Sequence, residues 1–301
     1  MKTKTLAFWA FFASVFFVSP QLFAQKIRAE KIGSKIDITI DGKFFTSYHF
    51  ASNEKYPYFY PVNGPSGASV TSMRNGTYPH HSSLFFGCDM VNGGNYWQEG
   101  LDRGQIVSLR ADIENLGEDK VVIHNECIWT RPNATAPIKD IRKIIISAAE
   151  PGIYQIDFDV EMEMLEDVTI RKTNHSLFSA RMDPDLAVTA GGIMINMEGD
   201  IGEKETFGKS SPWMDFYGKR GGGMEGLAIM QHPSNAWYPS PWFTRDYGFI
   251  SPTPMYWPED DEKGTVLQKG ESVKLRYRVL VHQGDHKDAG IQGKFEAYSK
   301  E

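Results

Sequence analysis

The chain has 301 residues, of which 41% are hydrophobic and 23% are charged, as is typical of a globular protein and not of a disordered or fibrous one. Its 38 acidic residues outnumber its 32 basic residues, and the formal net charge of −6 argues against a nucleic-acid partner, which requires a basic surface. A chain of this length can bury a large core, so its 2 cysteines are not required as disulfide staples.

The first 24 residues have the layout of a secretory signal peptide. Lys2 and Lys4 precede an apolar run over residues 6–18, and Ala24 provides a small residue at the expected cleavage point. This run is shorter than the roughly 20 residues that span a bilayer, and no later segment approaches that length. We therefore expect a periplasmic or secreted protein, without membrane insertion, whose mature form is residues 25–301.

Strand patterns dominate the mature chain. Residues 35–40 alternate apolar and polar side chains, and Asp41-Gly42 predicts a hairpin turn into residues 43–50. The longest alternation runs over residues 154–164, and residues 273–281 repeat it. Further β-rich runs cover residues 106–113, 121–129, 141–146 and 193–197. With no long helical periodicity, the pattern predicts an all-β fold, an antiparallel β-sandwich in a single domain (25–301) with long functional loops.

Two features of these strands have ordinary structural interpretations. The acidic row Asp157, Asp159, Glu161 and Glu163 alternates with apolar residues, so we interpret it as the solvated face of a strand and not as a site. Cys88 and Cys127 could pair in an oxidising compartment or be two small buried residues. The sequence leaves these two alternatives open.

The first loop-like segment, residues 56–97, holds the best catalytic candidates. His80 and His81 follow Pro79 and are surrounded by tyrosines. Adjacent histidines on a strand would face opposite ways, but in a loop both can turn toward one pocket. Histidine titrates near neutral pH, which suits proton transfer. The alternative is a pair of hydrogen-bonded structural histidines.

The second segment, residues 207–217, combines a cation, a flat ring and a carboxylate. Trp213 could stack on a sugar ring, and Lys209 could hold a carboxylate or sulfate. This mixture is common in sugar-binding clefts, although either side chain could equally belong to the surface or the core.

The third segment, residues 231–257, contains Trp237, Trp242 and Trp257 among several prolines. Arg245 could make a bidentate contact with a carboxylate, and the competing explanation is a structural pair with Asp246. His232 and Tyr247 could act as acid or base, and His232 and Asn235 are candidate substrate-binding residues. The residues that could serve the substrate here are His232, Asn235, Arg245 and Tyr247.

At these segments the sequence resembles a family of secreted bacterial proteins labelled PmoA-like. The resemblance rests on motifs that span the mature chain in order: Pro57-Tyr58-Phe59-Tyr60-Pro61, Pro79-His80-His81, Val91-Asn92-Gly93, Pro212-Trp213-Met214-Asp215, His232-Pro233-Ser234-Asn235, Arg245-Asp246-Tyr247-Gly248 and Leu275-Arg276-Tyr277-Arg278. The family pattern His-Pro-His-His-Arg-Ser is altered here, since Tyr78 and Ser82 replace the first His and the Arg. Near Thr173, where the family tends to carry an acidic residue, this chain has Asn174-His175-Ser176.

The resemblance implies a role in polysaccharide degradation. The label suggests methane oxidation, which we discount because that chemistry belongs to a membrane enzyme and the mature chain lacks a membrane span. The family instead resembles products of polysaccharide-utilisation loci. It implies an enzyme that removes water from the uronic-acid end of acidic, ulvan-type oligosaccharides. In that reaction His80, His81 and Tyr247 would supply acid and base, and Arg245 or Lys209 would hold the carboxylate.

Two other functions remain open at this point. A glycoside hydrolase could use a carboxylate pair such as Asp215 and Asp246. A glycan-binding protein could use Trp213, Trp237 and Trp242 as stacking platforms. The sequence predicts no cofactor and no metal ligands, and it leaves a dependence on a divalent metal open.

Overall fold

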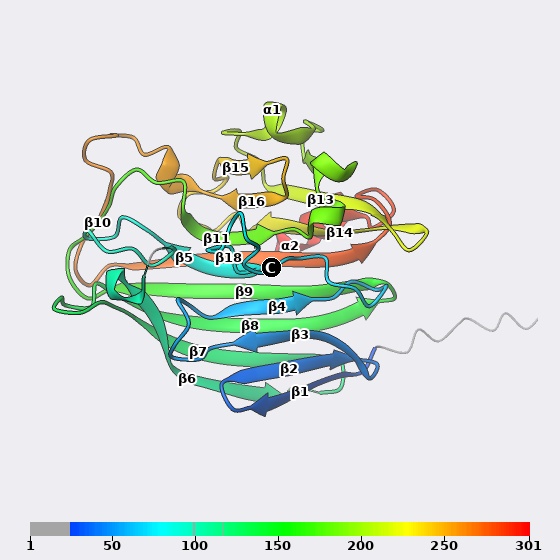
Figure 1. The fold of residues 1–301 in the computed structure, drawn as a ribbon, viewed down its shortest axis with the longest axis horizontal. Helices are drawn as coiled ribbons and strands as arrows, with labels where there is room; N and C mark the ends of the chain where they lie inside the picture. The colour runs from blue at the N-terminus through cyan, green and yellow to red at the C-terminus, as the bar shows by residue number, and fades with distance from the viewer. Residues whose placement is uncertain (1–24, 99, 116) are drawn as a thin grey trace, which may run out of the picture.

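The computed structural model describes residues 25–98, 100–115 and 117–301. The predicted signal peptide, residues 1–24, lies outside the described residues. The described chain is built on two eight-stranded sheets in which all paired strands are antiparallel (Figure 1). The prediction of an all-β antiparallel sandwich is confirmed.

The first sheet has the strand order β1-β2-β3-β4-β5-β11-β16-β15. Its strands are β1 (Ile27–Ile32), β2 (Lys35–Ile40), β3 (Lys43–His49), β4 (Tyr58–Val62), β5 (Leu84–Cys88), β11 (Ser176–Arg181), β16 (Phe249–Pro252) and β15 (Trp242–Arg245). The hairpin predicted between β2 and β3 is present. Asp41 and Gly42 both have positive φ, 51° and 75°, which a tight two-residue hairpin turn requires.

The second sheet has the strand order β12-β13-β14-β18-β9-β8-β7-β6. Its strands are β12 (Ile193–Asn196), β13 (Trp213–Arg220), β14 (Gly223–Gln231), β18 (Ser272–Gln283), β9 (Ile153–Met164), β8 (Ile138–Glu150), β7 (Lys120–Thr130) and β6 (Gln105–Asn115). A small third sheet pairs β10 (Val168–Ile170) with β17 (Thr265–Leu267). The helices are α1 (Gly202–Thr206) and α2 (Ile291–Tyr298), with short 3-10 turns at Leu101–Arg103, Pro184–Leu186, Val188–Ala190 and Pro254–Tyr256.

The main core lies between the two large sheets. Phe178 of β11 packs against Phe158 of β9 and Tyr277 of β18, with ring centroids 5.0 and 4.9 Å apart. On β9 buried and partly exposed residues alternate along the strand, as the sequence pattern predicts. The acidic row of β9 faces the basic row of β18 in cross-strand ion pairs, for example Asp157 with Arg278. The row is thus an ordinary strand face, solvated at Asp159 and Glu161 as expected but largely covered at Asp157, whose side chain is 13% exposed.

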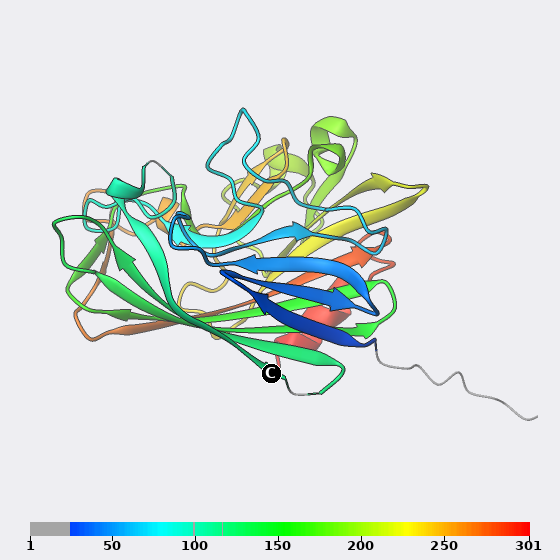
Figure 2. The same cartoon turned by 60° about the horizontal axis from the view of Figure 1, so that its bottom comes forward.

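The two cysteines are free and buried, so the structure favours the second of the two alternatives for them. Burial raises the pKa of both thiols, which keeps them protonated and unreactive. A second, smaller apolar cluster covers the other face of the second sheet, where α2 packs on β13 and β18. Figure 2 shows the long β4–β5 loop (cyan) rising at the top of the molecule, near the β15–β16 hairpin (orange).

Candidate functional site

The β4–β5 loop holds His80 and His81 in a closed turn. The Arg74 amide donates to the His81 carbonyl at 2.8 Å, and the His81 amide donates to the Tyr78 carbonyl at 3.2 Å. The Asn75 side chain accepts from the Tyr78 amide at 2.9 Å, which is a typical use of Asn in a turn. The turn therefore fixes the backbone from which Tyr78, His80 and His81 project.

Tyr78, His80, His81, His175 and Tyr247 form what we call the histidine cluster. Tyr78 stacks on His81 and on Tyr247, with ring centroids 5.1 and 4.3 Å apart. His80 meets His81 edge to face at 4.4 Å and His175 at 5.8 Å. The structure thus brings together the three predicted catalytic residues His80, His81 and Tyr247, although they come from two distant loops.

His80 and His81 have different surroundings. His80 is half-buried, and burial followed by the charge of His175 lowers its pKa. His81 is 3% exposed and stacks on Phe249 at 4.5 Å, and its Nδ1 atom has no partner among the described residues. Burial, with the nearby charges of His80 and Arg181, lowers the pKa of His81 to about 2. His81 therefore stays neutral and packs against its neighbours, while His80 is the more exposed of the two histidines.

His175 is held by a buried aspartate. Its Nδ1 atom lies 3.2 Å from Oδ2 of Asp89, a residue only 5% exposed. The Thr173 hydroxyl donates to the other oxygen of Asp89 and accepts from the His175 amide at 3.0 Å. The ring of His175 also stacks on Trp97 at 5.6 Å. An Asp–His pair of this kind fixes the tautomer and orientation of the imidazole and leaves its second nitrogen for chemistry.

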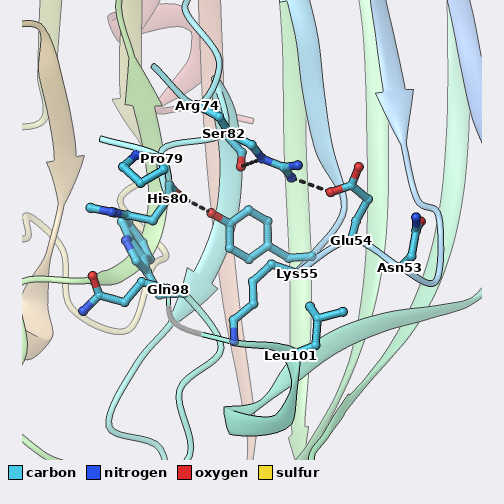
Figure 3. Close-up of a pocket in the computed structure, with 11 residues that line it drawn as sticks. Asn53, Glu54, Lys55, Arg74, Pro79, His80, Ser82, Gln98 and Leu101 are labelled. Carbon is cyan, nitrogen blue, oxygen red and sulfur yellow. Dashed lines mark hydrogen bonds and ion pairs between the residues drawn. The ribbon is translucent and has the colours of Figure 1, made fainter. Parts of the chain in front are cut away.

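A cleft of about 590 Å³ opens beside His80 (Figure 3). It is lined by Asn53, Glu54, Lys55, Tyr56, Arg74, Pro79, His80, Ser82, Trp97, Gln98 and Leu101. The Tyr56 hydroxyl donates to the His80 carbonyl at 2.9 Å, and Arg74 forms an ion pair with Glu54. The cleft is large enough for a ligand of a few sugar rings and carries both cations and hydrogen-bonding groups.

The sequence matches a family of unknown function, DUF6807, over residues 35–296. The chain belongs to this family. No curated protein matches it. Three solved structures are similar to the DUF6807 protein over most of its length, at low identity and low TM-score. A galactose 1-epimerase from Lactobacillus acidophilus NCFM is 9% identical with a TM-score of 0.41, covering 87% of this chain and 99% of its own.

The other two solved structures are described as putative aldose 1-epimerases. The one from Klebsiella pneumoniae is 8% identical with a TM-score of 0.42, covering 91% of this chain and 87% of its own. The one from Escherichia coli K12 is 11% identical with a TM-score of 0.35, covering 86% of this chain and 99% of its own.

Lys209 and Arg245, the predicted carboxylate-binding residues, have structural partners in the DUF6807 protein. Lys209 pairs with Asp200 at 3.1 Å and does not line the cleft. Arg245 pairs with Glu203 of α1 at 3.2 Å and lies over the ring of Phe243 at 4.0 Å. The structural explanation of Arg245 is therefore right in kind, but its partner is Glu203 and not Asp246.

Trp213, Asn235 and His232 lie away from the cleft. Trp213 is 3% exposed beneath α2, where its indole donates to Gln292 at 3.0 Å, so the expectation that it stacks on a sugar is wrong. The Asn235 side chain bonds both backbone groups of Arg276, and His232 contacts the Arg276 guanidinium at 2.9 Å. These polar residues hold the β14–β15 loop against β18.

The residues considered for a glycoside hydrolase or a glycan-binding protein mostly have structural roles. Asp215 is fully buried in a pair with His282, and Asp246 accepts a hydrogen bond from the backbone of α1 at 2.8 Å. These two carboxylates do not line the cleft. Trp242 is fully buried, and of the three proposed platforms only Trp237 is partly exposed.

Sequence reasoning missed Asp89, His175 and Arg181. Arg181, at the end of β11, is 4% exposed, and its Cζ atom lies 5.0 Å from the Tyr78 ring centre and 4.6 Å from that of Tyr247. Asp89 and His175 are 86 positions apart, so no local motif reveals their pairing.

Two further findings apply to the described residues only. Within residues 25–98, 100–115 and 117–301, no three His, Cys, Asp or Glu side chains are grouped so that they could hold a metal ion. Over the same ranges, every helix is too short or too polar to cross a bilayer.

Proposed function

We propose that this DUF6807 protein is a carbohydrate-active enzyme that eliminates water from the uronic-acid end of acidic oligosaccharides. The observation that carries the proposal is the Asp89–His175 pair, which lies against His80 at the edge of the cleft. The substrate class comes from the resemblance to exported proteins of glycan-degrading bacteria. Export to the periplasm or the medium is part of the same proposal.

His175 is the base in this proposal. With its Nδ1 proton directed to Asp89, Nε2 carries the lone pair and can take the C5 proton of the uronate. The Asp89 carboxylate stabilises the imidazolium that forms, as the aspartate does in a Ser-His-Asp triad. His80 has a lowered pKa and is neutral near pH 7, so it does not repel the charge that develops on His175.

Tyr247 is the acid in this proposal. Burial, with a contribution from Tyr78, raises the pKa of Tyr247 to about 12, so its phenol keeps its proton at working pH. The C5–H bond breaks as His175 takes the proton, and the electron pair forms the C4=C5 double bond. The C4–O bond then breaks, and the hydroxyl leaves as water with a proton from Tyr247. A net proton return from His175 to Tyr247 through solvent restores the site, and no oxidant or reductant is needed.

The proposal is tested by incubating the mature chain with oligosaccharides that carry a uronate at the non-reducing end. We expect the ultraviolet absorbance of an unsaturated uronate to grow and the product to be lighter by one water molecule. A matched oligosaccharide with a neutral hexose at that end is the control and should not react. Release of reducing ends without unsaturation would contradict the proposal and favour hydrolysis. Binding without any reaction would favour the non-catalytic alternative.

A further inference from the structure

Arg181 is held rigidly beside the histidine cluster. Its amide donates to the Ser83 carbonyl at 2.7 Å, and its carbonyl accepts from the Ser72 amide at 2.9 Å. Both partners belong to the β4–β5 loop that carries His80 and His81. The Arg181 side chain is therefore presented from a fixed backbone toward the rings of Tyr78 and Tyr247.

The guanidinium of Arg181 lacks the partners that buried charges normally have. Its Nε and Nη1 atoms are buried without a hydrogen bond among the described residues. Other buried arginines are paired, since Arg142 makes two hydrogen bonds to Asp140 and Arg278 pairs with Asp157 and Glu301. An unpaired buried charge is costly, so a group of this kind calls for an explanation.

The carboxylate of Asp183 lies close enough for its charge to act on Arg181, but it does not pair with this guanidinium. The nearby Asp183 is already engaged by Arg220 at 2.9 Å. The faces of Tyr78 and Tyr247 stabilise the cation, and Nδ1 of His81 is a second buried atom without a partner in the same cluster. Burial lowers the pKa of Arg181, but an arginine remains charged at any working pH.

We propose that Arg181 binds the carboxylate of the substrate's terminal uronate and gives the enzyme its specificity for acidic sugars. The planar fork of a guanidinium matches a carboxylate in a bidentate contact, and such contacts are strong where water is excluded. The inference rests on the proposed function for the identity of the anion as a uronate. A cation at this position would also stabilise the negative charge that spreads onto the carboxylate when the C5 proton leaves.

The binding of D-glucuronate to the mature chain, measured by calorimetry, tests this proposal without relying on turnover. We expect glucuronate to bind and glucose to bind much more weakly. Arg181→Met keeps the apolar stem and should weaken glucuronate binding by about 10- to 100-fold, the effect of losing a charge-assisted hydrogen bond. Arg181→Lys retains the charge without the fork and should give a smaller loss. It also serves as the second variant if Arg181→Met does not fold.

Arg278→Lys is the matched control because Arg278 is 7% exposed and paired with two carboxylates. It should leave glucuronate binding unchanged. The inference would be overturned if glucuronate bound equally well to the wild type and to both Arg181 variants. It would also be overturned if sulfate binding depended on Arg181 and glucuronate binding did not. Arg181-dependent glucuronate binding in a protein that eliminates no water would support the anion subsite and contradict the proposed reaction. The two proposals can therefore fail separately.

Discussion

Asp89 with His175 and Asp215 with His282 are two aspartate–histidine pairs of similar length, 3.2 and 2.9 Å, in different surroundings. The His175 side chain is 22% exposed beside the cleft, whereas both members of the second pair are fully inaccessible. In the second pair Oδ2 of Asp215 and Nδ1 of His282 are buried without a partner among the described residues. The second pair lies within the second sheet, on the side that α2 covers.

The comparison shows that accessibility, and not the presence of the pair, separates a candidate catalytic dyad from a structural one. Burial disfavours a charged His282, but the charge and hydrogen bond of Asp215 outweigh it and raise the pKa of His282. That pair is closed, because neither of its side chains is accessible from the surface. The first pair leaves its imidazole partly exposed beside His80 and Trp97, which line the cleft, so it can transfer a proton.

The largest expected effect comes from removing the exposed imidazole. His175→Gln should lower kcat for uronate-ended oligosaccharides by about 10²- to 10⁴-fold, the usual contribution of a positioned general base. Initial rates of unsaturated product formation measure this effect. His232→Gln is the matched control, since His232 contacts Arg276 away from the cleft, and it should retain the rate. A His175 variant with activity close to wild type would remove His175 from the mechanism.

Breaking the closed pair should affect stability instead of catalysis. Asp215→Ala leaves His282 buried without its counter-charge, which should cost about 3–5 kcal/mol in the free energy of unfolding. Urea unfolding at pH 7 measures the loss. The folded fraction of the variant should keep the wild-type kcat. A loss of kcat without a loss of stability would contradict the structural role that the comparison assigns to the Asp215–His282 pair.

The strands could be predicted because their patterns are local. The alternation on β9 and the Asp41-Gly42 turn each depend on neighbours in sequence. The loop histidines were also recognisable, since Pro79 and the surrounding tyrosines mark residues 78–81 as irregular. The Asp89–His175 pair could not be predicted because it is created by the register of β5 and β11, in which Ser176 faces Cys88.

The burial of Trp213 depends on a helix that the sequence pattern did not reveal. α2 spans only eight residues, Ile291–Tyr298, too few for a clear helical period. Its buried residues Ile291, Phe295 and Tyr298 join Trp213 in one apolar cluster. A tryptophan that looks like a sugar platform in the sequence is therefore a core residue once this short helix packs on it.

The smallest expected effect is on the pH dependence of stability. It concerns His81, which lies in the histidine cluster near His175 and should respond to pH with the opposite sign to His282 of the closed pair. The pKa of His81 is about 2 in the folded protein, far below the value of about 6.5 in an unfolded chain. Between these two pH values only the unfolded state takes up the proton. Stability should therefore fall by about 1.4 kcal/mol for each unit of acidification attributable to this residue. His81→Phe keeps the stacking on Tyr78 and Phe249 and removes the titration.

The free energy of unfolding of His81→Phe, measured from pH 7 down to pH 5, should therefore decline less steeply than that of wild type. His282 responds with the opposite sign, because a raised pKa stabilises the fold below the unfolded value and that contribution is lost as the pH rises through the folded one. His282→Phe should consequently change the slope on the alkaline side of about 6.5 and not on the acidic side. Equal slopes for wild type and His81→Phe would mean that the His81 ring is protonated in the folded cluster, and the neutral supporting role assigned to it would have to be given up.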